Sequence, residues 1–247
     1  MQKNAVQRIA EPIIGAYDEK SLPAEAVPDY LEENYWWAYL HPKSMRFFEQ
    51  QWVINSILWG NYARLRDATL DEMGSPISGR TLQVACVYGN LTPKLARRHR
   101  ADARLDVVDV APIQLENLSR KLNGDGNRVF LDRQDASSLD FNDASFDQVL
   151  MFFLLHELPR ETRICAATEA LRVLKPGGKL ILVDYHQPVW QHPHRYLMPL
   201  VFKTLEPFAL DLWGTELTHW IKADKPFGSI KKKIYFGGLY QKVVIEK

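Results

Sequence analysis

Arg80-Thr-Leu-Gln-Val-Ala-Cys-Val-Tyr-Gly-Asn90 is the stretch of sequence that decides the fold. Its apolar run from Leu82 to Cys86 predicts a short buried strand that ends in a turn at Gly89. Thr92-Pro93 then predicts the start of a helix, with Thr as the N-cap and Pro at the first helical position. A strand, a glycine turn and a helix N-terminus present backbone N–H groups to a nucleotide-like ligand in doubly wound α/β folds.

Strand and helix patterns continue to alternate up to about residue 185, which predicts a parallel sheet built from βαβ units. Further strands are predicted at 104–109, 129–131, 146–152 and 179–185, and helices at 113–122 and 160–174. In the tail, residues 230–235 and 240–245 are strand-like runs joined around Gly237-Gly238. They predict a closing antiparallel hairpin.

The flanking regions have a different composition. Residues 1–79 are helical in pattern and rich in aromatic side chains, which predicts a cap over the ligand-binding edge of the sheet. Residues 80–247 form the predicted Rossmann-like domain. An insertion at about 186–229, rich in His, Pro and aromatic residues, is expected to be a second wall of the same cleft.

Composition narrows the class of protein. The 247 residues have a formal net charge of +1, which argues against a nucleic-acid binder. Cys86 and Cys165 are expected to be reduced core residues of a cytoplasmic protein. No apolar window is long enough for a transmembrane helix, and the N-terminal residues carry charges and a proline where a signal peptide needs an apolar run.

Asp109 ends the second predicted strand, 20 residues after Gly89. A carboxylate at this place and spacing accepts hydrogen bonds from the ribose hydroxyls of an adenosine-type cofactor. NAD and S-adenosylmethionine (SAM) both use this arrangement, and a surface Asp that caps the next helix is the structural alternative. An NAD dehydrogenase is disfavoured, because no Gly-x-Gly-x-x-Gly follows the first strand.

Three later stretches are informative together: Arg133-Gln-Asp-Ala136, Leu139-Asp-Phe-Asn-Asp-Ala-Ser-Phe-Asp147 and Arg172-Val-Leu-Lys-Pro-Gly-Gly178. This series resembles the class I SAM-dependent methyltransferases, particularly the ubiquinone and menaquinone C-methyltransferases. The resemblance implies a mostly parallel, doubly wound sheet of seven strands. It also implies that Asp109 binds ribose, that Asp135 and Ala136 face adenine, and that Gly89 approaches the methionine portion. The full implied cofactor set is Gln83, Ala85, Cys86, Gly89, Asp109, Val110, Asp135, Ala136, Met151 and Phe152.

The first loop departs from the usual pattern of these methyltransferases. Gln83 replaces an Asp that helps to attract the amino group of the methionine, and Val87 replaces a Gly that allows close backbone approach. Tyr88 replaces a small residue. The loop is therefore typical either of a fold that has lost its cofactor or of a site that uses SAM for something other than ordinary methyl transfer.

Together with Tyr35-Trp-Trp-Ala-Tyr-Leu-His-Pro42 and Trp59-Gly-Asn-Tyr-Ala-Arg-Leu-Arg66, the altered loop resembles the rhodoquinone biosynthesis (RquA) family. The resemblance implies conversion of ubiquinone to rhodoquinone, with a ring methoxy group replaced by an amino group, SAM as the amino donor, and a divalent metal, manganese. The alternatives are a conventional SAM-dependent methyltransferase acting on a quinone or another small lipid-like substrate, and a non-catalytic binding module.

Tyr88 and His156 are the candidate catalytic residues. Tyr88 is placed to hydrogen-bond the amino-acid end of the cofactor or the quinone, and His156 follows the fourth strand as an acid, a base or a metal ligand. Capping of the next helix is the structural alternative for His156. Manganese prefers carboxylate and some imidazole, and Asp184 and His186 end the fifth strand, but no dense ligand motif assigns the metal.

A ubiquinone-type substrate lies in the bilayer, so peripheral association with the inner membrane is expected. The apolar, proline-broken stretch from Tyr196 to Trp213 is suited to dock on a membrane or to line a quinone channel. Lys231-Lys232-Lys233 would add attraction to anionic lipids. The structural alternatives are a core helix and a solvated strand edge.

Overall fold

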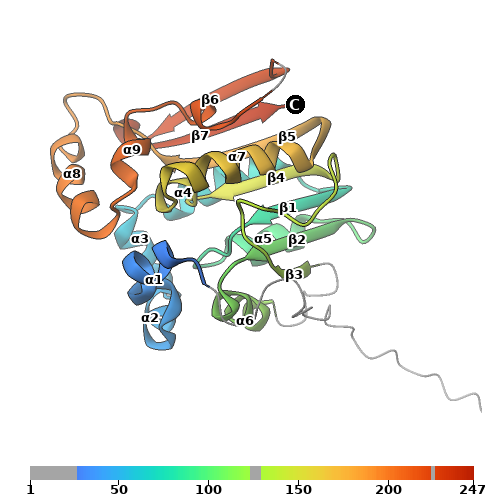
Figure 1. The fold of residues 1–247 in the computed structure, drawn as a ribbon, viewed down its shortest axis with the longest axis horizontal. Helices are drawn as coiled ribbons and strands as arrows, with labels where there is room; N and C mark the ends of the chain where they lie inside the picture. The colour runs from blue at the N-terminus through green and yellow to red at the C-terminus, as the bar shows by residue number, and fades with distance from the viewer. Residues whose placement is uncertain (1–26, 123–128, 224–225) are drawn as a thin grey trace, which may run out of the picture.

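The computed structural model describes residues 27–122, 129–223 and 226–247, and their framework is one seven-stranded sheet (Figure 1). The strand order is β3-β2-β1-β4-β5-β7-β6. The first five strands are mutually parallel, whereas β7 runs antiparallel to both β5 and β6. The strands are β1 (Arg80–Val84), β2 (Arg104–Asp109), β3 (Val129–Arg133), β4 (Phe146–Phe152), β5 (Leu174–Tyr185), β6 (Ser229–Tyr235) and β7 (Tyr240–Glu246).

The predicted fold class is confirmed, including the antiparallel hairpin at the C-terminal end. β2 and β4 have the predicted bounds, because both lie inside the sheet between other strands and most of their residues are buried. β1 ends two residues earlier than predicted. Its last residue is Val84, because Ala85 has a φ of 70° and so leaves the extended conformation.

Helices cover the sheet and its strand ends. In chain order they are α1 (Asp29–Tyr35), a π-helix (Trp36–Leu40), α2 (Pro42–Phe48), α3 (Gln51–Ile57), α4 (Tyr62–Met73), α5 (Leu91–Arg98), α6 (Pro112–Lys121), α7 (Arg160–Val173), α8 (His194–Leu205) and α9 (Ala209–Trp213). Short 3₁₀ turns lie at Leu155–Glu157, Leu217–Trp220 and Phe236–Gly238. In Figure 1, α7 lies in front of the sheet and α4 behind it, so both faces are covered.

Three local predictions were wrong. Cys165 is not a core residue, because its side chain on α7 is exposed, and Cys86 is only partly buried. Thr92 is not the N-cap of α5: the helix begins at Leu91 after Asn90, and the Thr92 hydroxyl donates instead to Oε1 of Gln83 at 3.0 Å. The Lys-Pro-Gly-Gly segment does not separate α7 from a strand at 179. β5 begins at Leu174, which pairs with Phe146, and the segment forms an irregularity in the ladder before Lys179 resumes the pairing.

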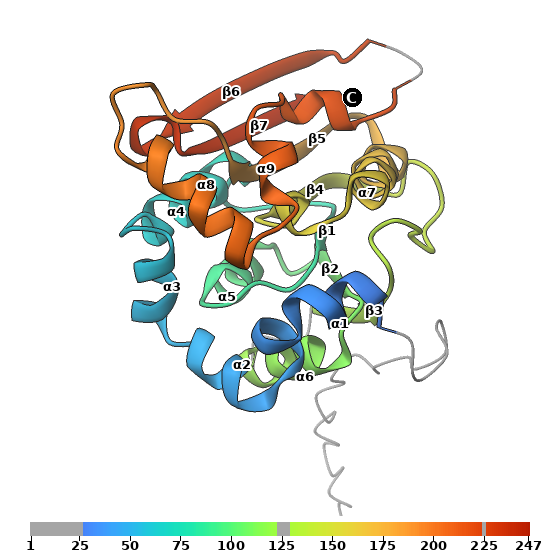
Figure 2. The same cartoon turned by 60° about the vertical axis from the view of Figure 1, so that its left-hand side comes forward.

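The N-terminal helices and the insertion gather at the carboxyl ends of the parallel strands (Figure 2). There α1 to α3 form one side and α8 the other. The part of the expected cap at 1–26 lies outside the described residues. In the described part of the chain, no helix is both long enough and apolar enough to cross a membrane.

Candidate active site

Two adjoining cavities open at the carboxyl ends of β1, β2 and β4. The smaller, about 610 Å³, lies above β1 and β2 and is closed on one side by Tyr30, Leu31 and Tyr39 of the cap. The larger, about 1550 Å³, lies between the cap and α8. Both are lined by Tyr39, Ala85, Cys86, Leu154 and Glu157, so these residues form the junction between the two cavities.

Most residues predicted for the site line one or both of these cavities. Ala85, Cys86, Asp109, Val110, Asp135 and Ala136 line the smaller cavity, and Tyr88, Phe152 and His156 line the larger one. Three residues of the implied cofactor set, Gln83, Gly89 and Met151, line neither.

Asp109 is buried at the end of β2 and has protein partners for both carboxylate oxygens. Its Oδ2 accepts the backbone N–H of Cys86 at 2.7 Å, and its Oδ1 accepts that of Ala111 at 2.8 Å. Burial nevertheless raises the pKa of Asp109 to about 6, because desolvation outweighs these two hydrogen bonds. Asp109 thus links the first loop to the start of α6 while it faces the cavity.

Gln83 and Gly89 stabilise the first loop, after β1, without lining either cavity. The fully buried Gln83 side chain donates to the carbonyl of Ala85 at 2.9 Å and accepts the Thr92 hydroxyl, so both of its polar ends are engaged within the loop. Gly89 has a φ of 80°, and a Cβ there would lie 2.5 Å from the Tyr62 hydroxyl. Only glycine fits at this position, because α4 approaches the loop closely.

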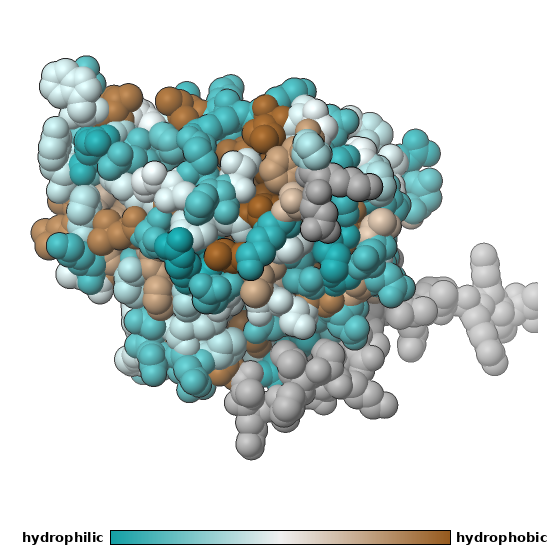
Figure 3. Space-filling model, turned by 45° about the horizontal axis from the view of Figure 1, so that its top comes forward, coloured by the Kyte–Doolittle hydropathy of each residue, from teal (hydrophilic) through white to brown (hydrophobic). Residues whose placement is uncertain are grey.

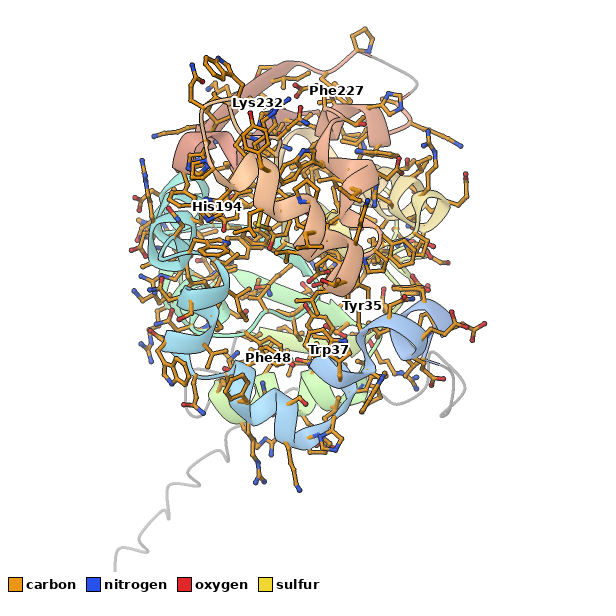
Figure 4. The ribbon with its side chains drawn as sticks, turned by 90° about the vertical axis from the view of Figure 1, so that its left-hand side faces the viewer. Tyr35, Trp37, Phe48, His194, Phe227 and Lys232 are labelled. Carbon is orange, nitrogen blue, oxygen red and sulfur yellow. The ribbon has the colours of Figure 1, made fainter. Side chains whose placement is uncertain are left out.

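Tyr88 joins the loop to the cap. Its hydroxyl donates to the carbonyl of Ala38 at 2.6 Å and accepts the side-chain N–H of Gln114 at 2.9 Å. Its ring stacks on Tyr39, with 5.7 Å between the ring centroids. Figure 4 shows Trp37 and Phe48 of the cap facing the space below α8. The Tyr88 ring therefore lines the larger cavity among other aromatic rings, and its hydroxyl binds the cap.

His156 lies in the 3₁₀ turn after β4 and forms a buried pair with Asp184 of β5. Its Nδ1 lies 2.8 Å from Oδ1 of Asp184. Burial lowers the pKa of His156, but the adjacent carboxylate outweighs it and raises the pKa to about 9. The Asp184 contact occupies Nδ1, and the ring lines the larger cavity, so Nε2 is the nitrogen that remains to act there.

Two glutamates accompany His156 at the inner end of the larger cavity. Its Nε2 lies 3.9 Å from Oε1 of Glu157 and 3.8 Å from Oε2 of Glu206, too far for hydrogen bonds but close enough for charge attraction. Burial raises the pKa of both carboxyl groups. Glu157 accepts the Tyr39 hydroxyl. Oε2 of Glu206 is buried and has no hydrogen-bond partner among the described residues. This acid–base cluster faces both cavities.

The described residues do not fit the manganese site that the resemblance implies. Among residues 27–122, 129–223 and 226–247, no three His, Cys, Asp or Glu side chains are arranged to hold a metal ion. Asp184 accepts from His156 and from the backbone N–H of Tyr185, and Nδ1 of His186 is bonded to the carbonyl of Gly238.

Sequence reasoning identified His156 but missed its partners. Asp184 was considered only as a metal ligand, although its place at the end of β5, beside β4, was a signal that it could meet His156. Glu157 follows His156 directly in the sequence. Glu206 and Tyr39 come from the insertion and the cap, and no local pattern indicated either.

Comparison with known proteins agrees with this geometry. Residues 81–178 match the family model of a methyltransferase domain. A demethylmenaquinone methyltransferase from Lactiplantibacillus plantarum is 30% identical over 155 residues, which are 59% of this chain and 65% of that protein. The ubiquinone/menaquinone biosynthesis C-methyltransferase UbiE of Idiomarina loihiensis is 30% identical over 134 residues, 53% of this chain and 50% of that protein. The matches therefore span less than two thirds of the length of either relative.

A solved structure extends the similarity of fold beyond the matched domain. A SAM-dependent methyltransferase from Aquifex aeolicus superposes with a TM-score of 0.53 at 16% identity, covering 83% of this chain and 97% of that one. Residues 81–178 thus resemble a methyltransferase domain, and the chain has the fold of the class I SAM-dependent methyltransferases.

Proposed function

We propose that this protein is a SAM-dependent transferase that modifies the ring of a quinone-type substrate. The observation that carries the proposal is the pair of joined cavities, with an acid–base cluster at their junction. The two curated relatives act, by their names, in menaquinone and ubiquinone methylation. Methyl transfer to a ring carbon is accordingly the reaction that the comparisons favour.

SAM is assigned to the smaller cavity, where Asp109 would accept the ribose hydroxyls and Asp135 and Ala136 would lie beside the adenine. Ala85 and Glu157, which line both cavities, would then lie where the methyl group of SAM meets the second substrate. When bound, SAM supplies the transferable group. The protein positions SAM and excludes water with the cap residues that close the cavity.

The larger cavity suits a ring with an apolar tail. Its walls are mostly aromatic and aliphatic, from Trp37, Phe48, Phe152, Met198 and others, and its polar groups lie at the inner end. A quinol ring placed against the cluster would have one hydroxyl beside Nε2 of His156. The tail would then extend between α3 and α8.

Methyl transfer needs an electron-rich ring, so the substrate in this reaction is the reduced quinol. The ring hydroxyl gives its proton to the ionised form of Glu157 or Glu206, which the raised pKa makes a stronger base, and the His156 imidazolium stabilises the resulting phenolate. The ring carbon attacks the methyl group while the C–S electron pair returns to sulfur. The ring then loses its C–H proton to a carboxylate, the phenolate oxygen is protonated, and aromaticity returns.

Amino transfer to an oxidised quinone is the second candidate, and the first loop is the observation that favours it. No carboxylate stands at position 83, and the Gln83 side chain is engaged with Ala85 and Thr92. Gln83 is therefore not available to hold the methionine amino group. This would leave the nitrogen free to add to the ring carbon that carries the methoxy group, with methanol leaving as a proton of the imidazolium is transferred to the methoxy oxygen. Loss of the Cα proton would then pass two electrons to the quinone ring, and water would hydrolyse the resulting imine, which breaks the Cα–N bond and releases an aminoquinol and a 2-oxo acid.

Doubly labelled SAM tests both reactions. The purified protein is incubated with SAM carrying ¹³C in the methyl group and ¹⁵N in the amino group, and with short-chain quinones and quinols, with and without manganese. We expect a ¹³C-methylated quinol and S-adenosylhomocysteine by mass spectrometry. If the product is instead a ¹⁵N-aminoquinone that lacks one methoxy group, the reaction is amino transfer, the second candidate. A product without either label would overturn the proposal.

The affinity for SAM is expected to depend on pH through Asp109. Because the pKa of this carboxyl is about 6, it is ionised at pH 7.5 and becomes protonated as the pH falls through 6. A protonated carboxyl accepts ribose hydroxyl protons less well, so binding weakens on the acid side. Calorimetry should show this loss in the parent protein and a weaker, pH-independent affinity in Asp109→Asn. An unchanged affinity in the variant would remove Asp109 from the SAM site.

A further inference from the structure

We propose that the face around the mouth of the larger cavity docks on the surface of an anionic lipid bilayer. This inference rests on the proposed function in one respect: the proposed quinone-type substrate would reach the larger cavity from the bilayer. The face, called here the mouth face, consists of residues 36–59 of the cap and 189–205 of the insertion.

Exposed apolar side chains gather on this face. Thirteen large apolar side chains are exposed in the described part of the chain, and eleven of them belong to the mouth face. Those eleven are Trp36, Phe47, Trp52, Ile57, Trp59, Val189, Trp190, Tyr196, Leu197, Leu200 and Leu205. Single exposed apolar residues are ordinary, whereas such a concentration in two segments marks an interaction surface.

The mouth face continues directly into the larger cavity. Ile57, Trp59 and Leu205 line the cavity and are also 47%, 41% and 47% exposed, so they form its rim. The Trp59 ring lies 4.3 Å from that of His194, which brings the end of α3 against the start of α8. A lipid tail could therefore pass from a bilayer into the cavity along apolar side chains.

α8 carries large apolar side chains on its outer side as well as on its buried side, together with the exposed Lys203 and Thr204. Met198 and Phe202 are buried against the protein, while Tyr196 and Leu200 point outward and are 69% and 64% exposed. A surface helix of a protein in water carries polar residues on its outer side. The Tyr196 hydroxyl donates to the carbonyl of Trp190, so these exposed rings and Leu200 form one continuous patch. Tryptophan and tyrosine are the side chains that favour the membrane–water interface.

The charges of the mouth face select an anionic bilayer over a second copy of the chain. The two segments contain four cationic residues, Lys43, Arg46, Arg195 and Lys203, and a single acidic one. That acidic residue, Glu49, is paired with Lys121 at 2.7 Å. Anionic headgroups attract such cations. A symmetric dimer through this face would instead bring the same excess of positive charge together.

The outer strand of the sheet is a different surface. The predicted contribution of Lys231-Lys232-Lys233 is reduced, because Lys232 is paired with Glu216 at 2.7 Å. In Figure 4, Lys232 lies at the opposite end of the view from Trp37 and Phe48. Figure 3 shows apolar atoms at the left-hand edge, the side on which α8 lies in Figure 1. β6 nevertheless carries the other two exposed apolar residues, Ile230 and Ile234, which provide a control.

Vesicle flotation of the full chain tests the proposal, with neither SAM nor quinone present. Vesicles of phosphatidylcholine with phosphatidylglycerol are compared with phosphatidylcholine alone. We expect the parent to float mainly with the anionic vesicles. The triple variant Trp190→Ser/Tyr196→Ser/Leu200→Ser should bind about ten-fold less or worse, since it removes apolar area from the patch. None of these three residues lines a cavity.

The control variant Ile230→Thr/Ile234→Thr removes two exposed apolar side chains from β6 and should float like the parent. Transfer to a short-chain, water-soluble substrate should be the same in all three proteins. A parent that does not float, or a triple variant that floats as well as the parent, overturns the proposal. So does a dimer in solution that the triple variant abolishes. Flotation without any transferase activity would overturn the proposed function but not the docking.

Discussion

The His156→Asn enzyme is expected to turn over at about one hundredth of the parent rate or less, with its affinity for SAM nearly unchanged. His156 lines the larger cavity and does not line the smaller one, so the loss should appear in kcat and not in SAM binding. Asparagine keeps a donor near Nδ1 for Asp184, which limits the structural damage. The measurement is steady-state kinetics with calorimetry of SAM.

His186→Asn is the matched control. His186 lies two residues after Asp184, is half-buried, and lines neither cavity, so its replacement should leave kcat within about two-fold of the parent, as for a residue outside the site. Equal losses in the two variants would point to damage at the end of β5 and contradict an acid–base role for His156.

The pH profile separates that role from packing. Because Asp184 holds the pKa of His156 near 9, the imidazolium persists at neutral pH and activity should fall as the pH rises through 9. In Asp184→Asn the falling limb should move toward lower pH, since the adjacent negative charge is gone. A limb that stays in place would mean that another group titrates.

The Arg163→Met variant is expected to lose about 3 kcal/mol or more of the free energy of unfolding. The fully buried Arg163 guanidinium donates to the carbonyls of Leu155 and Phe208, both at 2.7 Å, and to that of Leu158 at 3.0 Å. It also lies 4.5 Å from the centre of the Trp220 ring. Methionine fills most of the space but removes the guanidinium donor from all three carbonyls, and the Leu155 carbonyl keeps only the backbone N–H of Leu158 at 3.4 Å.

Arg160→Met is the control variant, because it removes the same positive charge from the same helix. Arg160 is on the same helix and pairs with Asp211 at 3.2 Å, as Arg163 also does at 3.3 Å, but its side chain is 58% exposed. Its replacement should cost about 1 kcal/mol or less. Urea unfolding followed by circular dichroism measures both variants. A loss below 1 kcal/mol in Arg163→Met would show that the carbonyls find other donors.

The sequence predicted best the parts of the fold that depend on local pattern. β2 and β4 were predicted to the residue, because most residues of each strand are buried between neighbouring strands. Thr92 was misplaced, because its hydroxyl bonds to Gln83 nine residues away in the chain, and helix-capping rules consider only neighbours.

The sequence predicted those residues of the candidate site that lie at the ends of parallel strands. Asp109 and His156 each follow a parallel strand, and both face a cavity. Two other members of the acid–base cluster come from separate segments: Glu206 directly follows α8, and Tyr39 belongs to the π-helix of the cap. Their approach to His156 depends on how the cap and insertion pack, and one sequence without relatives carries no pattern for such long-range contacts.

The position of Tyr39 has a consequence for the order of events in a catalytic cycle. Tyr39 lines both cavities, and its hydroxyl donates a hydrogen bond to Glu157. A cap residue that closes the smaller cavity therefore also belongs to the acid–base cluster. The hydrogen bond from Tyr39 to Glu157 exists only while the cap covers the smaller cavity, so the cluster is complete only in this closed arrangement. Under the proposed function, exchange of the cofactor through an opened cap and chemistry at the complete cluster would therefore alternate in time.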